Sequence, residues 1–250
     1  MMKGNSDEKI LSYNDVVLRK SDLGILGGPY FLNDQIIEFY FSYLSTCCPS
    51  DDILLVPPSM TFWIMNCPAA WSLEDFLEPL HLPDKTLVIF PINDNDDVSK
   101  AGGGFHWSLL AFERKANVFV HHDSCGSMNK IHARRLYNAV ARYMGFSNSA
   151  IDASFIESTD SPQQKNWYDC GLYVIGIAKV ICNWHLNHRY SYADGLWFSA
   201  LKEQITPSAI AGSRSEILAL IRDLIARANL SDKMAVLYLE TGDCARKCLI

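Results

Sequence analysis

The sequence lacks any long apolar run and any excess of positive charge. No window holds about 18 uninterrupted apolar residues, which is the length that a membrane-spanning helix needs. The 250 residues include 22 Lys and Arg against 28 Asp and Glu, which gives a net charge of −6. Nucleic acids and anionic membrane surfaces attract basic proteins, so we expect neither as a partner.

Signals for secretion are also missing. The first residues, MMKGNSDEKILSY, contain no apolar segment of the kind that a signal peptide needs. The sequence has eight cysteines, which we therefore expect to be reduced thiols in the cytosol or the nucleus. The last residues, CARKCLI, leave only two positions after Cys248, so they do not form a prenylation motif.

The apolar pattern predicts an α+β domain. The chain is 49% hydrophobic, enough for the core of one large domain or at most two small ones. No element is assigned to residues 1–12, taken as a loose start, or to the last twenty residues. Strands are expected over residues 86–92, 105–112, 117–122 and 154–157, the middle pair 105–112 and 117–122 forming a hairpin, and residues 53–56 are a short apolar run that Pro57 and Pro58 end. Helices are expected over residues 33–46, 129–144, 170–184 and 213–229, with shorter pieces over 59–79. This order favours a mixed, mainly antiparallel sheet packed against helices.

One cysteine stands out by its position. The stretch QQKNWYDCGLYVIGIAKVIC, residues 163–182, places Cys170 between a polar turn and a run too apolar for a surface helix. A helix that begins there puts an exposed thiol at its N-terminus, where free N–H groups and the helix dipole favour the thiolate. That arrangement makes a cysteine a nucleophile. A small buried cysteine that only fills space is the commoner interpretation of a single cysteine.

A cysteine nucleophile needs a base, and the base needs an orienting group. His106 opens a predicted strand after a glycine-rich loop, in GGGFHWSLL, and Asp123 ends the next strand, in VFVHHDSC. In an antiparallel hairpin the start of one strand lies beside the end of the other. His106 and Asp123 should therefore be neighbours at one sheet edge. A satisfied strand histidine and a turn-forming aspartate are the simpler interpretations.

A third requirement is a pair of donors for an oxyanion. The backbone N–H of Cys170 can supply one of them. Gln164, six residues earlier, can swing its side-chain amide into the same site. An ordinary loop glutamine is the competing interpretation.

Six segments together resemble the ubiquitin-like-protein-specific cysteine proteases, which are the SUMO and Rub (neddylation-modifier) proteases. The likeness is strongest to their small single-domain deneddylase branch. The segments are LND (32–34), FLEPLHLPDK (76–85), INDN (92–95), GGGFHWSLL (102–110), HHDSC (121–125) and QQKNWYDCGLYV (163–174). The resemblance implies a papain-like architecture of the ubiquitin-like protease type. In it, a mixed sheet is flanked by helices, and a buried helix starts at the nucleophile.

The resemblance also implies roles for the residues named above. Cys170 would be the nucleophile and His106 the base. Asp123 would orient the imidazole of His106. Gln164 would line the oxyanion hole.

Three further positions match substrate-binding positions of the family. Trp107 resembles the tryptophan that covers a narrow tunnel for a Gly-Gly tail. Phe31 stands where the family often has a second tryptophan, so an aromatic lid is kept but its grip on the tail can differ. Asp34 matches an acidic position that faces the basic surface of the modifier.

The implied function is thiol-dependent cleavage after the C-terminal Gly-Gly of a ubiquitin-like modifier, above all Rub. Such an enzyme matures the precursor and removes the modifier from target lysines. Its partners would be the modifier and conjugates such as cullins, and we expect a monomer that uses no cofactor and no metal. The protease domain would span residues 11–229, followed by a tail, 230–250, of unknown role.

Four other hypotheses compete with this one. The first is a SUMO-specific protease of the same family. The second is an acetyltransferase on a related fold, which would need coenzyme A and usually a basic pocket. The third is an inactive modifier-binding module. The fourth is a zinc site of His121, His122 and Cys125, which is disfavoured because adjacent strand residues point to opposite faces of a sheet.

Overall fold

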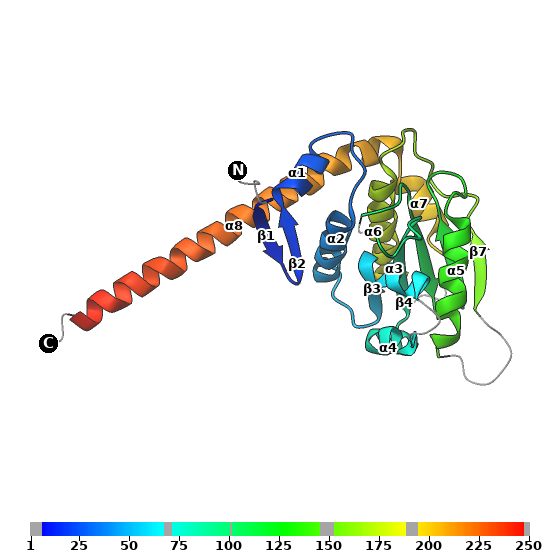
Figure 1. The fold of residues 1–250 in the computed structure, drawn as a ribbon, viewed down its shortest axis with the longest axis horizontal. Helices are drawn as coiled ribbons and strands as arrows, with labels where there is room; N and C mark the ends of the chain where they lie inside the picture. Colours follow the sequence, from blue (N-terminus) through cyan, green and yellow to red (C-terminus); the bar gives the residue numbers. More distant parts are fainter. Residues whose placement is uncertain (1–6, 68–71, 101, 146–152, 189–194, 248–250) are drawn as a thin grey trace.

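The computed structural model of the chain describes residues 7–67, 72–100, 102–145, 153–188 and 195–247, and for 231–247 it describes the backbone alone. A five-stranded sheet lies at the centre with helices on both faces (Figure 1). A two-stranded hairpin packs beside it against α2 and α8. The predicted α+β class is confirmed.

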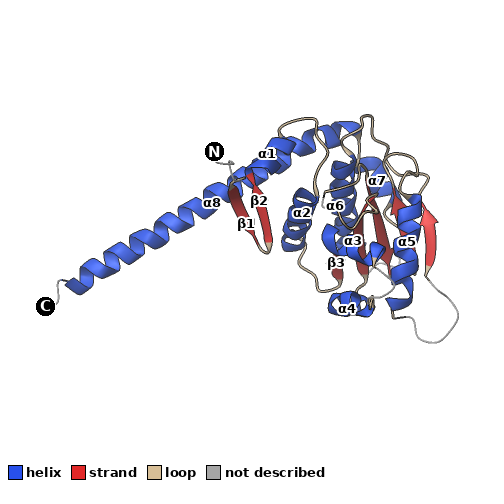
Figure 2. Ribbon diagram, in the orientation of Figure 1, coloured by secondary structure: helices blue, strands red, loops and turns tan. Residues whose placement is uncertain are grey.

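The central sheet is mixed (Figure 2). Its strands follow the order β3-β4-β5-β6-β7, with parallel outer pairs and antiparallel inner pairs. The four predicted strands begin and end within two residues of their predicted ranges, and the central hairpin is confirmed, while the short apolar run at 53–56 supplies the fifth strand. The strands are β3 (Ile53–Leu55), β4 (Leu87–Asn93), β5 (Trp107–Glu113), β6 (Val118–His122) and β7 (Ser154–Glu157).

The sheet separates two hydrophobic cores, because successive strand residues point to opposite faces. In β4, Leu87 and Ile89 belong to one core, and Val88 and Phe90 to the other. The first core is covered by α2 (Asp34–Cys47), α6 (Cys170–His188), α7 (Phe198–Gln204) and α8 (Pro207–Lys247). The second is covered by α3 (Pro58–Asn66), α4 (Glu74–Leu77), α5 (Lys130–Val140) and the short 3-10 helices η1 (Glu78–Leu80), η2 (Leu82–Asp84) and η3 (Ala141–Tyr143).

The N-terminal segment differs from the prediction of a loose start. Strands β1 (Lys9–Tyr13) and β2 (Val16–Arg19) pair antiparallel, and α1 (Lys20–Leu26) follows. Their turn contains Asn14 at φ 47°, a left-handed conformation that asparagine tolerates. The hairpin forms because its apolar side chains join the first core. The prediction was therefore wrong for residues 9–12, while residues 1–6 lie outside the described chain.

Helix α6 begins at Cys170, as predicted, and ends four residues beyond the predicted limit. Most of its side chains are buried, as expected for a helix with almost no polar face. The N–H of Tyr173 donates to the carbonyl of Asp169 at 3.0 Å, so Asp169 caps the helix. A Cβ added at Gly171 would lie 2.8 Å from the Cβ of Leu32. Glycine at this position therefore lets the segment at Leu32 approach the start of the helix.

Helix α8 is longer at both ends than the predicted range 213–229. Thr206 caps it, since the Thr206 hydroxyl accepts from the N–H of Ala209 at 3.2 Å and Pro207 occupies the first helical position. Its first half packs on the first core, and its second half extends away from the body (Figure 1). Within the described residues, no helix is both long and apolar enough to cross a membrane.

Candidate active site

His106 and Asp123 meet at one edge of the sheet. His106 directly precedes β5 and Asp123 directly follows β6, and both side chains are buried. The Nε2 of His106 lies 2.7 Å from Oδ1 of Asp123. The antiparallel register pairs Leu109 with His122, which brings the two flanking residues together as strand geometry predicted. The strand itself begins at Trp107, two residues later than expected.

The Asp123 carboxylate is held by the backbone that follows it. The N–H of Cys125 donates to Oδ1 at 2.8 Å, and the N–H of Asn129 donates to Oδ2 at 2.9 Å. Burial raises the pKa of Asp123, but its hydrogen bond to His106, the Asn129 N–H and the charge of His106 outweigh burial and hold the pKa below its usual value. The group is therefore a carboxylate that fixes the imidazole.

His106 also faces the thiol. Cys170 is close enough to the imidazole to affect its pKa, and because Nε2 faces Asp123, the other ring nitrogen is Nδ1. Burial lowers the pKa of His106, but the hydrogen bonds to Asp123 and Cys170 and the charges of both groups reverse that effect and raise it to about 9. At neutral pH the ring is thus an imidazolium, which can give a proton to a leaving group.

Cys170 is fully buried, which corrects the expectation of an exposed thiol. Leu32 packs against Gly171, and the Leu32 carbonyl accepts from the indole Nε1 of Trp107 at 2.9 Å. The start of α6 is therefore packed against a segment that lies far away in the sequence.

Gln164 lies in the loop that precedes α6, and its side chain is held in one orientation. Its backbone N–H donates to the carbonyl of Ser124 at 2.8 Å. The Ser124 hydroxyl donates to Oε1 of Gln164 at 2.8 Å, and Nε2 of Gln164 donates to the Asn166 carbonyl at 2.7 Å. An amide nitrogen carries two N–H groups, and Asn166 takes one. Ser124 thereby fixes which end of the Gln164 amide can donate.

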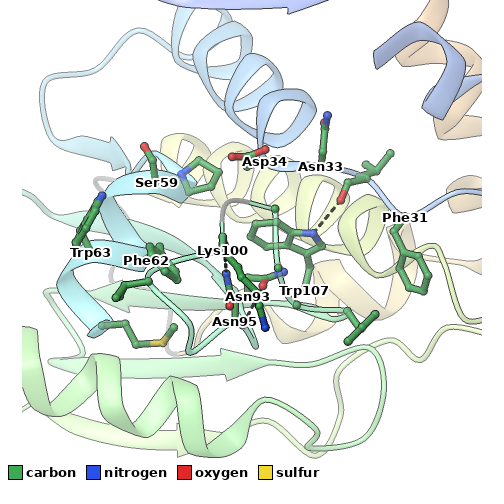
Figure 3. Close-up of a pocket in the computed structure, with 18 residues that line it drawn as sticks. Phe31, Asn33, Asp34, Ser59, Phe62, Trp63, Asn93, Asn95, Lys100 and Trp107 are labelled. Atoms are coloured by element: carbon green, nitrogen blue, oxygen red, sulfur yellow. Dashed lines mark hydrogen bonds between the residues drawn. The ribbon is translucent and has the colours of Figure 1, made fainter. Parts of the chain in front are cut away.

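Phe31, Asp34 and Trp107 line one cavity of about 430 Å³ (Figure 3). Residues of α3, including Phe62 and Trp63, form another wall, and the loop before β5 closes a further side. His106 and Cys170 are not among the lining residues. Leu32, which lines the cavity, packs against Gly171, the residue after Cys170, and Trp107, which also lines it, directly follows His106 in the chain. The cavity therefore lies beside the segments that carry Cys170 and His106.

Sequence analysis gave no role to two residues that hold His106. Oδ1 of Asp94 accepts from the N–H groups of Phe105 and His106, at 2.6 and 3.0 Å. The side-chain amide of Asn129 donates to the carbonyl of His106 at 3.2 Å. The INDN segment contains Asp94. Its distance from His106 in the sequence does not indicate this contact, because only the folded loop brings the two residues together.

The two adjacent histidines of β6 point to opposite faces, as predicted. His121 contacts Glu157 at 2.9 Å and Ser108 at 3.0 Å. His122 contacts Ser161 at 2.9 Å through Nδ1 and accepts from Nε1 of Trp197 at 2.8 Å. Burial, followed by the charge of His121, lowers the pKa of His122 to about 3. In the part of the chain that the structure describes, no three His, Cys, Asp or Glu side chains gather as metal ligands would.

Comparisons with known proteins agree on one family. Residues 73–188 match the model of the Ulp1 protease family, C-terminal catalytic domain. The NEDD8-specific protease 1 of Arabidopsis thaliana is 51% identical over 224 residues, which are 90% of this chain and 97% of that protein. The sentrin-specific protease 8 of Rattus norvegicus is 36% identical over 225 residues, 88% of this chain and 95% of that protein. A crystal structure of a de-sumoylating protease has the same fold, with a TM-score of 0.68 at 14% identity, covering 93% of this chain and 96% of that one.

The close approach at Gly171 can be tested by adding one methyl group. Gly171→Ala should lower the free energy of unfolding by about 1–3 kcal/mol, because the new Cβ overlaps Leu32. Gly24→Ala in α1 is the matched control, since a Cβ there meets nothing within 4 Å. We expect the control to be neutral or stabilising by up to about 1 kcal/mol. Equal urea midpoints for the two variants would contradict the packing described here.

The raised pKa of His106 can be tested by NMR titration of the histidine rings. The wild-type ring should titrate near pH 9. Asp123→Asn removes the carboxylate charge that raises the pKa of His106. Burial, which lowers that pKa, then has the larger effect, so the pKa of His106 should fall. An unchanged His106 pKa in the Asp123→Asn protein would show that the carboxylate does not set it. His132→Gln removes the signal of a histidine outside the site, whose Nε2 lies 3.4 Å from Oδ1 of Asp96, and so helps to assign the remaining signals.

Proposed function

The chain belongs to the Ulp1 protease family and is a cysteine protease, and on that basis we propose that it cleaves after the C-terminal Gly-Gly of the neddylation modifier NEDD8, or Rub. The contact chain from Cys170 through His106 to Asp123 is the observation that carries the chemistry. The 51% identity to a NEDD8-specific protease over nearly the whole of both chains supports the choice of modifier.

In the proposed reaction, the Cys170 thiolate attacks the carbonyl carbon of the terminal glycine. The C–N bond then breaks, and the His106 imidazolium gives its proton to the departing amine. The amine is the side chain of a target lysine or the first residue of a precursor extension. The remaining thioester is attacked by water, from which His106 takes a proton, and Cys170 is released as thiolate. Asp123 keeps the imidazole oriented throughout.

The tetrahedral intermediate carries a negative oxygen that needs donors. We assign this task to the backbone N–H of Cys170 and to the Nε2 group of Gln164. Ser124 supports this role, because its hydroxyl holds the opposite end of the Gln164 amide. Donors fixed in advance stabilise the oxyanion without a cost of reorganisation during the reaction.

The cavity beside Cys170 suits a tail that ends in two glycines. Trp107 and Phe31 are flat aromatic walls, and glycine has no side chain to clash with them. We assign Asp34, at the rim of this cavity, to a basic surface of the modifier. The substrates would be the precursor and conjugates such as cullins, handled by a monomer in the cytosol or nucleus.

A sentrin- or SUMO-type modifier is the competing substrate. The rat relative is named for sentrin, and the solved de-sumoylating protease has the same fold. The higher identity to the protease named for NEDD8 favours the neddylation modifier. Membership in a protease family leaves the acetyltransferase hypothesis without support.

A panel of fluorogenic substrates tests both the reaction and the modifier. NEDD8, SUMO and ubiquitin, each with a C-terminal fluorogenic amide, are incubated with the purified protein. We expect rapid release from NEDD8 and little from the others. Faster release from SUMO would overturn the choice of modifier and keep the chemistry. No release from any of them by folded protein would favour the inactive modifier-binding module.

Cys170→Ala should abolish release and still bind NEDD8, since only the attacking sulfur is lost. Binding is measured by calorimetry, and Cys47→Ala, which changes an exposed cysteine, should keep wild-type activity. Cleavage by the Cys170→Ala protein would refute the assignment of the nucleophile.

If Gln164 donates to the oxyanion, its removal should lower kcat strongly, and removal of Ser124, which orients it, should lower kcat less. Gln164→Ala should lower kcat by about 10²–10³-fold. Ser124→Ala should cost about two- to tenfold, the equivalent of one neutral hydrogen bond of about 0.5–1.5 kcal/mol. Gln204→Ala, at an exposed glutamine of α7, should have no effect. A Gln164→Ala enzyme with wild-type kcat would exclude the side chain from the oxyanion site.

A further inference from the structure

Arg214, in the first half of α8, holds the chain segment that leads to the aromatic wall of the cavity. Its Nη1 donates to the carbonyl of Ile25 at 3.1 Å, near the end of α1. Its Nη2 donates to the carbonyl of Tyr30 at 2.6 Å. Tyr30 directly precedes Phe31, so the guanidinium fixes the backbone immediately before that wall.

The same guanidinium holds the segment that leads to the nucleophile. Nη2 donates to the carbonyl of Tyr168 at 3.2 Å, and both Nε and Nη2 donate to Oδ1 of Asp169, at 3.2 and 3.0 Å. The other carboxylate oxygen of Asp169 accepts from the side-chain amide of Asn166 at 2.7 Å. Asp169 caps α6 and directly precedes Cys170. By holding Asp169, Arg214 therefore fixes the start of the helix from which the Cys170 thiol projects.

The Arg214–Asp169 pair is buried, which distinguishes it from ordinary surface ion pairs. Their side chains are 12 and 11% exposed, whereas Arg227 and Asp223 further along α8 are 74 and 52% exposed. A buried ion pair is weak grounds for stability, because desolvation offsets the attraction. Arginine is suited to this site because its planar fork can donate in several directions at once, and a lysine cannot reach all these acceptors together.

The two segments that Arg214 joins meet again at the active site. Leu32 packs on Gly171, and its carbonyl accepts from the indole of Trp107. The segment that carries the aromatic wall and the segment that carries the nucleophile are therefore in contact through Leu32 and Gly171, and both are also bound by the Arg214 guanidinium. Movement of either segment would change how the cavity is aligned with the Cys170 thiol.

We propose that Arg214 is a positioning residue for the cleavage reaction, which keeps the wall at Phe31 in register with Cys170. This inference rests on the proposed function. It places α8 within the machinery of the site, although none of the α8 side chains that the structure describes lines the cavity. A displacement of about 1 Å between reacting groups can cost about 100-fold in rate, so loss of this tie should be measurable.

The test compares Arg214→Lys and Arg214→Ala with Arg227→Ala, which removes an exposed arginine from the same helix. With the NEDD8 fluorogenic amide, both Arg214 variants should show a higher KM, and kcat per folded molecule should fall by about tenfold or more. Arg227→Ala should match the wild type. If Arg214 only stabilised the fold, kcat would fall in proportion to the unfolded fraction, measured by circular dichroism, and KM would not change; that result overturns the proposal.

A second readout is independent of the substrate. Iodoacetamide alkylation of Cys170, followed by mass spectrometry, should be slower per folded molecule in Arg214→Lys than in Arg227→Ala, because the thiol is no longer aligned with His106. If Arg214→Ala fails to fold, Arg214→Lys decides the question. If no modifier is cleaved even by the wild type, the proposed function fails, and alkylation still decides: a slower rate supports the role of Arg214, and an unchanged rate overturns it.

Discussion

The site depends on the register between two neighbouring strands. The pairing of β5 with β6 brings His106, just before one strand, against Asp123, just after the other, at 2.7 Å. The turn that sets this register passes through Asn117 at φ 51°. A slip by one residue would exchange the two faces of a strand and separate the pair. The alternation of strand side chains that fills the two cores thus also sets the register that brings His106 and Asp123 together.

The remaining groups reach that edge from both sides of the sheet. The helix that begins at Cys170 comes from the first core, together with the segment at Leu32 that covers it. From the second core come α3, which lines the cavity, and Asn129, which holds both His106 and Asp123. A buried thiol beside a protonated imidazole results from packing on both faces.

Local patterns predicted much of this architecture, and distant contacts account for what they missed. Four of the five strands and the start of α6 follow from short-range periodicity, and the neighbourhood of His106 and Asp123 follows from hairpin geometry. The hairpin at residues 9–19 was missed because it forms by packing against α2 and α8, which the local pattern does not show. Burial of Cys170 was missed because the start of α6 packs against segments far away in the chain, as Leu32 does against Gly171, and the partners of Arg214 lie up to 189 positions away in the chain. The roles of the site residues remain predictions.

The environment of His122 has a consequence for tolerance of acid and alkali. This ring is neutral in the fold with a pKa of about 3, whereas an exposed histidine titrates near 6.5. The stability that it contributes is therefore lost as the pH falls from about 6.5 toward 3. His106 acts in the opposite sense, because its pKa of about 9 means that its contribution disappears as the pH rises from about 6.5 toward 9. The two histidines together therefore stabilise the fold most strongly near neutral pH. The contribution of His122 is lost in acid, and the contribution of His106 is lost in alkali.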